Sequence, residues 1–261
     1  MDEPRPPLRP AWLRWTPVWR RNALVWRKLA VASLHGNFGE PLLYLVALGY
    51  GLGALVGEVG GLPYLEFLAS GIVCSSAMMT ASFEGTYSAY SRMAVQRTWD
   101  AVTMAPLSVG DVVTGEMVWA ASKAMLSATA ILLVSAAMGV VHGPAAVLAL
   151  PVVALVGLAF SALALVVTAV ARSYDFFLYY TTLFVTPLLL LSGVFFPLEQ
   201  TPPAIRAAAA VTPLSHAVAL VRPLMVGTPV PPVLPHLLVL AAYAVAGWLL
   251  ATRLSRRRLE A

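Results

Sequence analysis

Six apolar stretches, each long enough to cross a bilayer as a helix, dominate this chain of 261 residues. The hydrocarbon core of a membrane is about 30 Å thick and requires roughly 20 apolar residues in a helix. Such continuous runs lack the alternation of a membrane barrel, and a helix pairs its own backbone polar groups in lipid. The apolar windows are 41–59, 64–88, 112–141, 145–171, 176–196 and 233–252. We therefore expect an all-α integral membrane protein with six transmembrane helices.

Basic residues outside these windows predict the orientation, because cytoplasmic segments near membrane ends are enriched in Lys and Arg. They precede the first window, lie between windows two and three and between four and five, and follow the sixth window. With an even number of spans these segments share one side, and only Arg206 and Arg222 lie on the other. Both termini are thus expected in the cytoplasm. The formal net charge of +5 indicates contact with anionic lipid headgroups and not nucleic-acid binding.

Segment 1–35 is expected to be a cytoplasmic tail followed by an amphipathic helix in the membrane interface. Its tryptophans and its regularly spaced basic residues fall on opposite sides of a helix with 3.6 residues per turn. The two stripes are Trp12, Trp15, Trp19 and Trp26, and Arg14, Arg21 and Lys28. Thr16 is the expected N-cap and Pro17 the first helical residue. Membrane anchoring and docking of a partner are both open interpretations of this helix.

Three glycines of the first window, Gly49, Gly53 and Gly57, recur every four residues and would share one helix face. A nucleotide-binding glycine loop would follow a strand, and here the glycines lie in an expected spanning helix. The spacing favours close packing of this helix against another helix or against a second copy of the chain.

The polar segment 92–107, between windows two and three, is a candidate surface helix that contacts a soluble partner. Its candidate contact residues are Arg97, Thr98, Trp99, Asp100 and Met104. An aromatic side chain flanked by charges is a compact anchor at protein interfaces, so we expect Trp99 to be presented to the partner. An ordinary solvated loop is the alternative. Ser108 and Asp111 have the spacing of a capping box at the start of the third span.

Ionisable groups near lipid are costly, so those close to the cytoplasmic boundary are candidates for a translocation path or gate. They are Glu40, Glu84, Glu116 and Asp175. Structural pairing with Arg92, Lys123 or Arg172 is an equally open alternative. Tyr87 and Tyr179 belong to an aromatic group near the same boundary, and either an interfacial belt or stacking against sugar rings would explain it.

Several separated motifs, occurring in order along the chain, are similar to the permease subunit of type-2 ATP-binding-cassette exporters, in the branch of nodulation protein J and the daunorubicin-type exporters. They are Phe83-Glu84-Gly85-Thr86-Tyr87, Arg97-Thr98-Trp99-Asp100, Ala105-Pro106-Leu107, Gly115-Glu116-Met117-Val118-Trp119, Leu191-Ser192-Gly193-Val194-Phe195-Phe196-Pro197-Leu198 and Thr212-Pro213-Leu214-Ser215-His216-Ala217. The resemblance covers essentially the whole chain.

This resemblance implies a six-span domain over 36–261, with a coupling helix in 92–107 and two short outer re-entrant helices at about 198–228. The prolines and glycines of 193–232 independently support short, broken helices there. The resemblance also implies two copies of the permease, as a homodimer, and two copies of a P-loop ATPase in a bacterial cytoplasmic membrane. The expected cargo is a lipo-oligosaccharide or other glycolipid, with a hydrophobic drug or antibiotic as the alternative.

The sequence contains no G-x-x-x-x-G-K-[ST] phosphate loop, so ATP and Mg²⁺ are expected on the partner ATPase, and this chain is expected to bind no cofactor or metal and to catalyse no reaction. A membrane-embedded transferase acting on lipid-linked sugars is a different possibility, but the chain offers no aspartate-rich pair or H-E-x-x-H motif for it. An ion-coupled secondary transporter would show paired repeats with broken helices, and none is visible.

Overall fold

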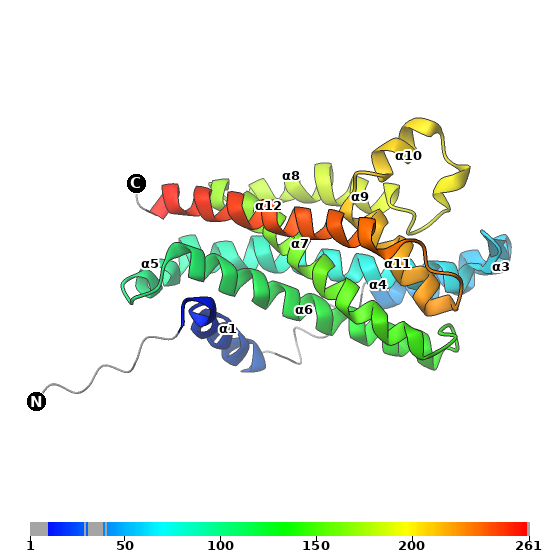
Figure 1. The fold of residues 1–261 in the computed structure, drawn as a ribbon, viewed down its shortest axis with the longest axis horizontal. Helices are drawn as coiled ribbons and strands as arrows, with labels where there is room; N and C mark the ends of the chain where they lie inside the picture. The colour runs from blue at the N-terminus through cyan, green and yellow to red at the C-terminus, as the bar shows by residue number, and fades with distance from the viewer. Residues whose placement is uncertain (1–9, 29, 31–38, 40, 260–261) are drawn as a thin grey trace, which may run out of the picture.

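The computed structural model describes residues 10–28, 30, 39 and 41–259 and forms an elongated helical bundle (Figure 1). The α-helices are α1 (Thr16–Lys28), α3 (Gly53–Val56), α4 (Tyr64–Phe83), α5 (Thr98–Thr103), α6 (Val109–Ala137), α7 (Ala149–Val170), α8 (Asp175–Tyr180), α9 (Thr186–Leu191), α10 (Pro203–Ala209), α11 (Pro213–Val226) and α12 (Val233–Leu259). Shorter 3₁₀ or π-helical segments are Ala11–Leu13, Ala47–Leu52, Glu84–Ser88, Ser91–Val95, Pro144–Leu148, Thr181–Val185 and Leu198–Gln200. Strands β1 (Glu58–Val59) and β2 (Leu62–Pro63) form a small antiparallel hairpin.

Each of the six apolar windows contains a helix. Four stretches are long and apolar enough to cross a membrane, namely Tyr64–Val95, Val109–Ala137, Pro144–Val170 and Val233–Leu259. Helices α10 and α11 form a pair bent by 88° that would count as a fifth. The windows of the first and fifth expected spans hold the shorter apolar helices Pro41–Val56 and Asp175–Leu191. The structure thus confirms an all-α membrane protein, and the count of six spans stays a prediction.

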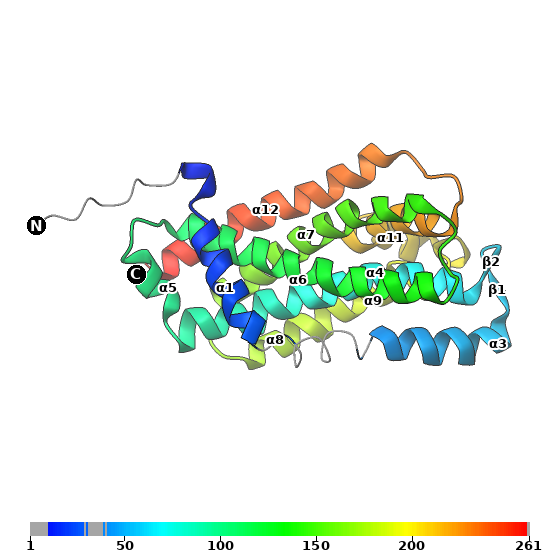
Figure 2. The ribbon, with the colours of Figure 1, turned by 90° about the horizontal axis from the view of Figure 1, so that it is seen from below.

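Both views show which short segments lie at each end of the bundle. Helices α1 and α5 and the C-terminal end of α12 lie at one end, whereas α3 and the β-hairpin lie at the other (Figures 1 and 2). The basic Arg256, Arg257 and Arg258 occupy the last turn of α12. This arrangement groups the basic segments that the charge pattern assigns to a single side.

Helix α6 begins with the predicted capping box. The Ser108 hydroxyl accepts a hydrogen bond from the Asp111 backbone N–H at 3.2 Å, and the Asp111 carboxylate accepts one from the Ser108 backbone N–H at 2.9 Å. These bonds satisfy donors that the first helical turn would otherwise leave unpaired. They fix the point at which the chain turns from α5 into the bundle.

Small residues allow the central helices to approach closely. A Cβ added at Gly157 of α7 would lie 2.9 Å from the Cα of Ala121 of α6, and one at Gly247 of α12 would lie 2.9 Å from the Cβ of Ala162 of α7. A Cβ added at Gly85 would lie 2.7 Å from the Cβ of Ala164 of α7. Close backbone approach is a principal source of helix association in lipid, where no hydrophobic driving force acts between helices.

The glycines of the first window do not share a single face. Gly49 is buried against the Leu65 side chain, and a Cβ added at Gly53 would lie 3.6 Å from the Tyr64 ring. Gly57 ends the helix with φ +70°, and a Cβ there would meet no described atom within 4 Å. Gly49 and Gly53 both lie toward α4, whereas the helix ends at Val56 and Gly57 is its C-cap. The prediction for Gly57 as a helix-face residue is therefore wrong, and a contact between two copies stays a prediction.

Helix α1 packs obliquely across α6 (Figure 2). Val18 fits against Gly115, where an added Cβ would lie 2.6 Å from the Val18 Cβ. Trp19 donates a hydrogen bond to Ser122 at 3.1 Å, and the ring of Trp26 meets that of Trp119 edge-on at 6.1 Å. Two of the tryptophans thus contact protein, and an interfacial position in the membrane stays a prediction.

Two details of α1 differ from the expectation. The helix begins at Thr16, whose hydroxyl donates to the Leu13 carbonyl at 2.8 Å and so closes the preceding turn. Arg21 was expected on a side opposite to the tryptophans, but it extends toward Glu116 of α6. The buried carboxylate of Glu116 requires a charged partner, and Arg21 supplies one although its place in the amphipathic pattern predicted a solvent-facing side chain.

A half-buried arginine organises the end of the bundle that carries α10. Arg222 of α11 donates to the Gly193 carbonyl at 2.7 Å and to the Ser70 hydroxyl at 3.0 Å. Its guanidinium carbon lies 3.6 Å from the centre of the Phe67 ring. Arg222 therefore joins α11 to α4 and to the break that follows α9. Helix α11 begins at Pro213 and is capped after Val226 by Gly227 with φ +75°, and α10 begins at Pro203.

Candidate coupling and translocation site

Five charged side chains form an ionic cluster between α1, the helix that continues from α4, and α6. Arg92 bridges both carboxylates, with its Nη2 2.9 Å from Oε1 of Glu84 and 2.6 Å from Oε2 of Glu116. Lys123 lies 2.8 Å from Oε2 of Glu84, and Arg21 lies 3.4 Å from Oε1 of Glu116. Glu84 and Glu116 are 3% and 1% exposed. Of the two interpretations of these acidic residues, the geometry supports structural pairing with Arg92 and Lys123.

Neutral donors complete the coordination of the two carboxylates. Trp119 donates to Oε1 of Glu84 at 2.9 Å, and Asn22 of α1 donates to Oε2 of Glu116 at 3.0 Å. Trp99 of α5 donates to Oε1 of Glu116 at 3.3 Å. Buried charges require partners of this kind because desolvation is costly. A single carboxylate, that of Glu116, thereby connects α1, α5 and two long helices.

Trp99 does not face a soluble partner. It is 1% exposed and packs inside the protein, because its indole buries a large apolar area while its N–H reaches Glu116. The expectation that Trp99 itself is presented at the surface is wrong. The exposed part of this segment is formed by Met104, which is 90% exposed, and by the neighbouring Arg97, Ala101, Ala105 and Pro106.

The remaining residues of this segment fix its geometry. Arg97 adopts a left-handed conformation with φ +49°, which redirects the chain into α5. Thr98 donates to the Arg92 carbonyl at 2.8 Å, and Asp100 is half-buried in the first turn of α5. The helix itself covers only Thr98–Thr103 of the predicted 92–107. Through Thr98 and Trp99, α5 is attached directly to the ionic cluster.

A cavity of about 570 Å³ opens beside the ionic cluster, and we call it the α1 basin. Its charged and polar lining includes Arg21, Asn22, Glu84, Arg92, Gln96 and Lys123. Trp26, Tyr87, Trp119 and Tyr174 supply aromatic surface. Burial lowers the pKa of the Arg21 guanidinium from its ordinary value, and Glu116 opposes this shift whereas Arg92 adds to it. The basin thus combines positive charge with aromatic surface.

Tyr87 belongs to an aromatic cluster that borders the basin. Its ring stacks on Phe83 at 4.9 Å and on Tyr174 at 6.1 Å, and it meets Phe177 edge-on at 5.1 Å. Tyr179 lies apart from these contacts and is 62% exposed, and Asp175 is exposed at the start of α8. Glu40 lies outside the described residues. The structure therefore brings Tyr87, Glu84 and Glu116 together and leaves Asp175 and Tyr179 separate.

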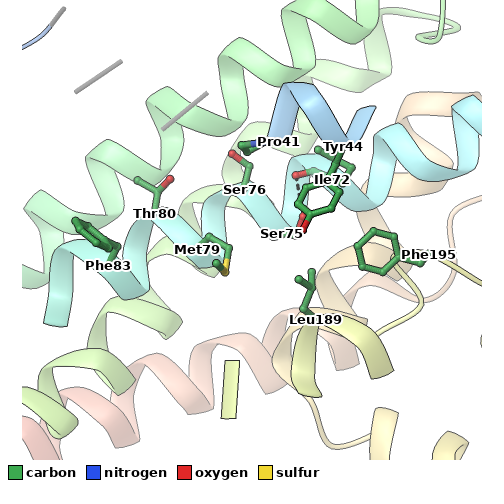
Figure 3. A pocket seen from close by; sticks show the side chains of 10 residues that line it. All are labelled: Pro41, Tyr44, Ile72, Ser75, Ser76, Met79, Thr80, Phe83, Leu189 and Phe195. Atoms are coloured by element: carbon green, nitrogen blue, oxygen red, sulfur yellow. Dashed lines mark hydrogen bonds between the residues drawn. The ribbon is translucent and has the colours of Figure 1, made fainter. Parts of the chain in front are cut away.

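A second cavity, of about 300 Å³, lies between the helices of the first, second and fifth apolar windows (Figure 3). Its lining comprises Pro41, Tyr44, Ile72, Ser75, Ser76, Met79, Thr80, Phe83, Leu189 and Phe195. Tyr44 and Phe195 face one another across it with ring centres 6.3 Å apart. The hydroxyls come from Ser75, Ser76 and Thr80 of α4 and from Tyr44, and the rest of the lining is apolar. This lining suits an amphipathic molecule.

The sequence reasoning did not select Arg21, Asn22 or Trp119 as site residues. One available signal was the spacing of Glu116, Trp119 and Lys123, which places all three on one face of a helix. Glu84 and Arg92 share a face in the same way. No local spacing predicts that α1 contributes to the site, because Asn22 and Glu116 are 94 positions apart in the sequence.

The bundle and the ionic cluster define a multi-pass helical membrane protein whose polar surface segment is linked to a buried charge network. The ABC-2 type transporter family model matches residues 13–226. The chain therefore belongs to the ABC-2 type transporter family and is a membrane permease of that class.

Curated relatives agree with this assignment. The chain is 50% identical to nodulation protein J of Rhizobium leguminosarum bv. viciae, over 95% of both chains. It is 51% identical to nodulation protein J of Rhizobium leguminosarum bv. trifolii, over 95% of this chain and 94% of the relative. Nodulation protein J of Sinorhizobium fredii is 47% identical over 94% of each chain.

Proposed function

We propose that this chain is the permease subunit of an ATP-driven exporter that moves an amphipathic glycolipid, such as a lipo-oligosaccharide, out of the cytoplasm. One observation carries the coupling step. Helix α5 is joined by Trp99 to Glu116, and Glu116 is joined by Arg92 to Glu84. A movement imposed on α5 is therefore transmitted to α6 and to the helix that continues from α4.

In this proposal the chain has six spans, with both termini in the cytoplasm of a bacterium. The first and fifth spans are the shorter helices Pro41–Val56 and Asp175–Leu191, and α10 with α11 forms an outer re-entrant pair. The clustering of α1, α5 and the basic end of α12 at one end of the bundle supports this topology.

A separate P-loop ATPase, present in two copies, binds ATP and Mg²⁺ and contacts α5. The contact surface consists of Arg97, Asp100 and Met104 together with the small residues around them, while Thr98 and Trp99 transmit the movement. Two permease copies, proposed to be identical, enclose the path. The exposed apolar faces of Pro41–Val56 and α8–α9 support a contact between copies, because the described residues leave side chains such as Tyr50, Leu55 and Leu183 uncovered.

The cargo is proposed from the two cavities. The cavity of Figure 3 offers apolar walls for an acyl chain, and hydroxyls on α4 for polar groups. The aromatic residues around Tyr87 offer faces for sugar rings. A hydrophobic drug would use the apolar walls of the Figure 3 cavity but not these hydroxyl and aromatic groups, so the lining favours the glycolipid.

The test is reconstitution of the full chain with a co-purified P-loop ATPase in inverted vesicles. ATP-dependent accumulation of a fluorescent lipo-oligosaccharide, absent without the ATPase and insensitive to ionophores, is the expected result. Accumulation of a hydrophobic drug alone would replace the glycolipid with drug efflux. Transport by the isolated chain, driven by an ion gradient, would overturn the exporter assignment.

A further inference from the structure

The charges of the ionic cluster do not balance. Three cations, Arg21, Arg92 and Lys123, share two carboxylates, those of Glu84 and Glu116. Within the described part of the chain, no other carboxylate lies within 4.0 Å of these cations. These five described side chains therefore sum to a net charge of one positive unit. Arg21 has the longest of the four ion-pair contacts and the most exposed side chain, at 29%.

The cluster also contains more hydrogen-bond donors than acceptors. A carboxylate has about four lone-pair sites. Glu116 receives Arg21, Asn22, Arg92 and Trp99, and its acceptor capacity is used. An arginine has five N–H donors and a lysine ammonium has three. Among the described residues, the Nη1 groups of Arg21 and Arg92 reach no acceptor, and Lys123 reaches only Glu84. Donors therefore remain in excess beside a cavity that these three cations line.

A bound anion would both neutralise the excess positive charge and accept hydrogen bonds from the excess N–H donors. A neutral sugar would accept these hydrogen bonds but would not neutralise the charge. The α1 basin adjoins an aromatic border formed by Trp26, Tyr87 and Tyr174, the residue types found where headgroups meet acyl chains. The cytoplasmic leaflet is rich in anionic lipids, each attracted to a nearby basic side chain by about 1 kcal/mol. We propose that the α1 basin binds the phosphate headgroup of one anionic phospholipid, with Arg21 as the principal contact.

This lipid shares the aromatic border of Tyr87 and Tyr174 with the proposed cargo, but the basin would recognise it by its phosphate and not by sugar rings. The site requires a membrane-embedded chain but requires neither ATP hydrolysis nor a particular substrate. It would place a lipid phosphate next to the Glu116 network that connects α1 with α5. Failure of ATPase association or of glycolipid transport would therefore leave the binding experiment unaffected.

The experiment is a lipid titration of the full-length chain in detergent, followed by native mass spectrometry, with phosphatidylglycerol and phosphatidylcholine as probes. We expect a preference for phosphatidylglycerol. Arg21→Gln should weaken phosphatidylglycerol binding about fivefold and leave phosphatidylcholine unchanged, because it removes one charge contact and makes the cluster neutral. Arg21→Lys should keep most of the preference, which separates loss of charge from misfolding.

Arg20→Gln is the matched control, since Arg20 is the adjacent, exposed arginine of the same helix. It should bind phosphatidylglycerol as the unaltered chain does. Equal weakening by Arg20→Gln and Arg21→Gln would overturn the site in favour of general surface attraction. Absence of any headgroup preference would also overturn it. Displacement by millimolar inorganic phosphate would assign the basin to a soluble anion, and equal binding of a neutral glycolipid would assign it to cargo.

Discussion

The indole nitrogen of Trp99 lies 3.3 Å from Oε1 of Glu116, so the short surface segment α5 is attached to the buried charge network of the bundle. Trp99 is 1% exposed, although it belongs to the segment proposed to meet the ATPase. The proposed mechanism therefore divides contact and transmission between neighbouring residues. In it, exposed Met104 contacts the ATPase, whereas Trp99 passes the displacement to α6.

Trp99→Phe tests this division. The phenyl ring retains most of the packing but loses the hydrogen bond to a charged acceptor, which contributes about 1.5–3 kcal/mol. We expect a lower thermal unfolding temperature in detergent and a larger fraction of ATP hydrolysed without transport. Met104→Ala should leave the unfolding temperature unchanged and weaken ATPase affinity. Identical behaviour of Trp99→Phe and the unaltered chain in both assays would show that the bond transmits nothing.

Glu84→Gln should destabilise the bundle strongly, because Lys123 and Arg92 would each lose a buried partner. Breaking a buried ion pair in this way costs about 3–5 kcal/mol. Lys123→Met in the same chain removes the stranded charge and should restore part of the stability. Thermal unfolding of the single and double variants measures the effect. A double variant less stable than Glu84→Gln alone would contradict the pairing of Lys123 with Glu84.

The sequence predicted the local features well. Apolar runs located a helix in every window, and the spacing of Ser108 and Asp111 predicted the cap of α6. These features depend on neighbours within one or two turns. The Asn22–Glu116 contact depends on how α1 crosses α6, which periodicity does not encode.

The glycine spacing failed for a related reason. A regular period assumes that the helix continues, but it ends at Val56, and Gly57 caps it with φ +70°. Trp99 was misassigned because composition alone does not distinguish an aromatic anchor for a partner from one for the protein's own interior.

Gly115→Ala should displace α1 from α6. The added methyl would lie 2.6 Å from the Val18 Cβ and 2.9 Å from the Trp15 carbonyl oxygen, so backbone must move. Overpacking of this kind costs about 1–3 kcal/mol. Gly110→Ala in the same helix is the control, because its nearest neighbours would be at an ordinary 3.6 Å. Unfolding temperature and protease cleavage of α1 report the difference, and equal effects at both positions would refute close docking of α1.

Arg222→Met should loosen the end of the bundle that carries α10. It removes the donor to the buried Gly193 carbonyl, at a cost of about 1–3 kcal/mol, and also the bond to the Ser70 hydroxyl, which keeps its bond to the Phe67 carbonyl. Hydrogen exchange at α11 should increase. Arg206→Met, on exposed α10, should change neither exchange nor stability. Faster exchange in Arg206→Met of the same size would mean that loss of any positive charge at this end is sufficient.

Met79→Trp should block the cavity of Figure 3 without disturbing the charge network. Met79 lies on the cavity wall, and an indole there would occupy much of the roughly 300 Å³ available. We expect ATP-driven glycolipid transport to fall about tenfold, equivalent to ~1.4 kcal/mol, while ATPase affinity and unfolding temperature are retained. Leu133→Trp adds the same bulk on an outward-facing position of α6, where Leu133 is 65% exposed. If Leu133→Trp lowers transport as much as Met79→Trp does, the cavity does not lie on the path of the cargo.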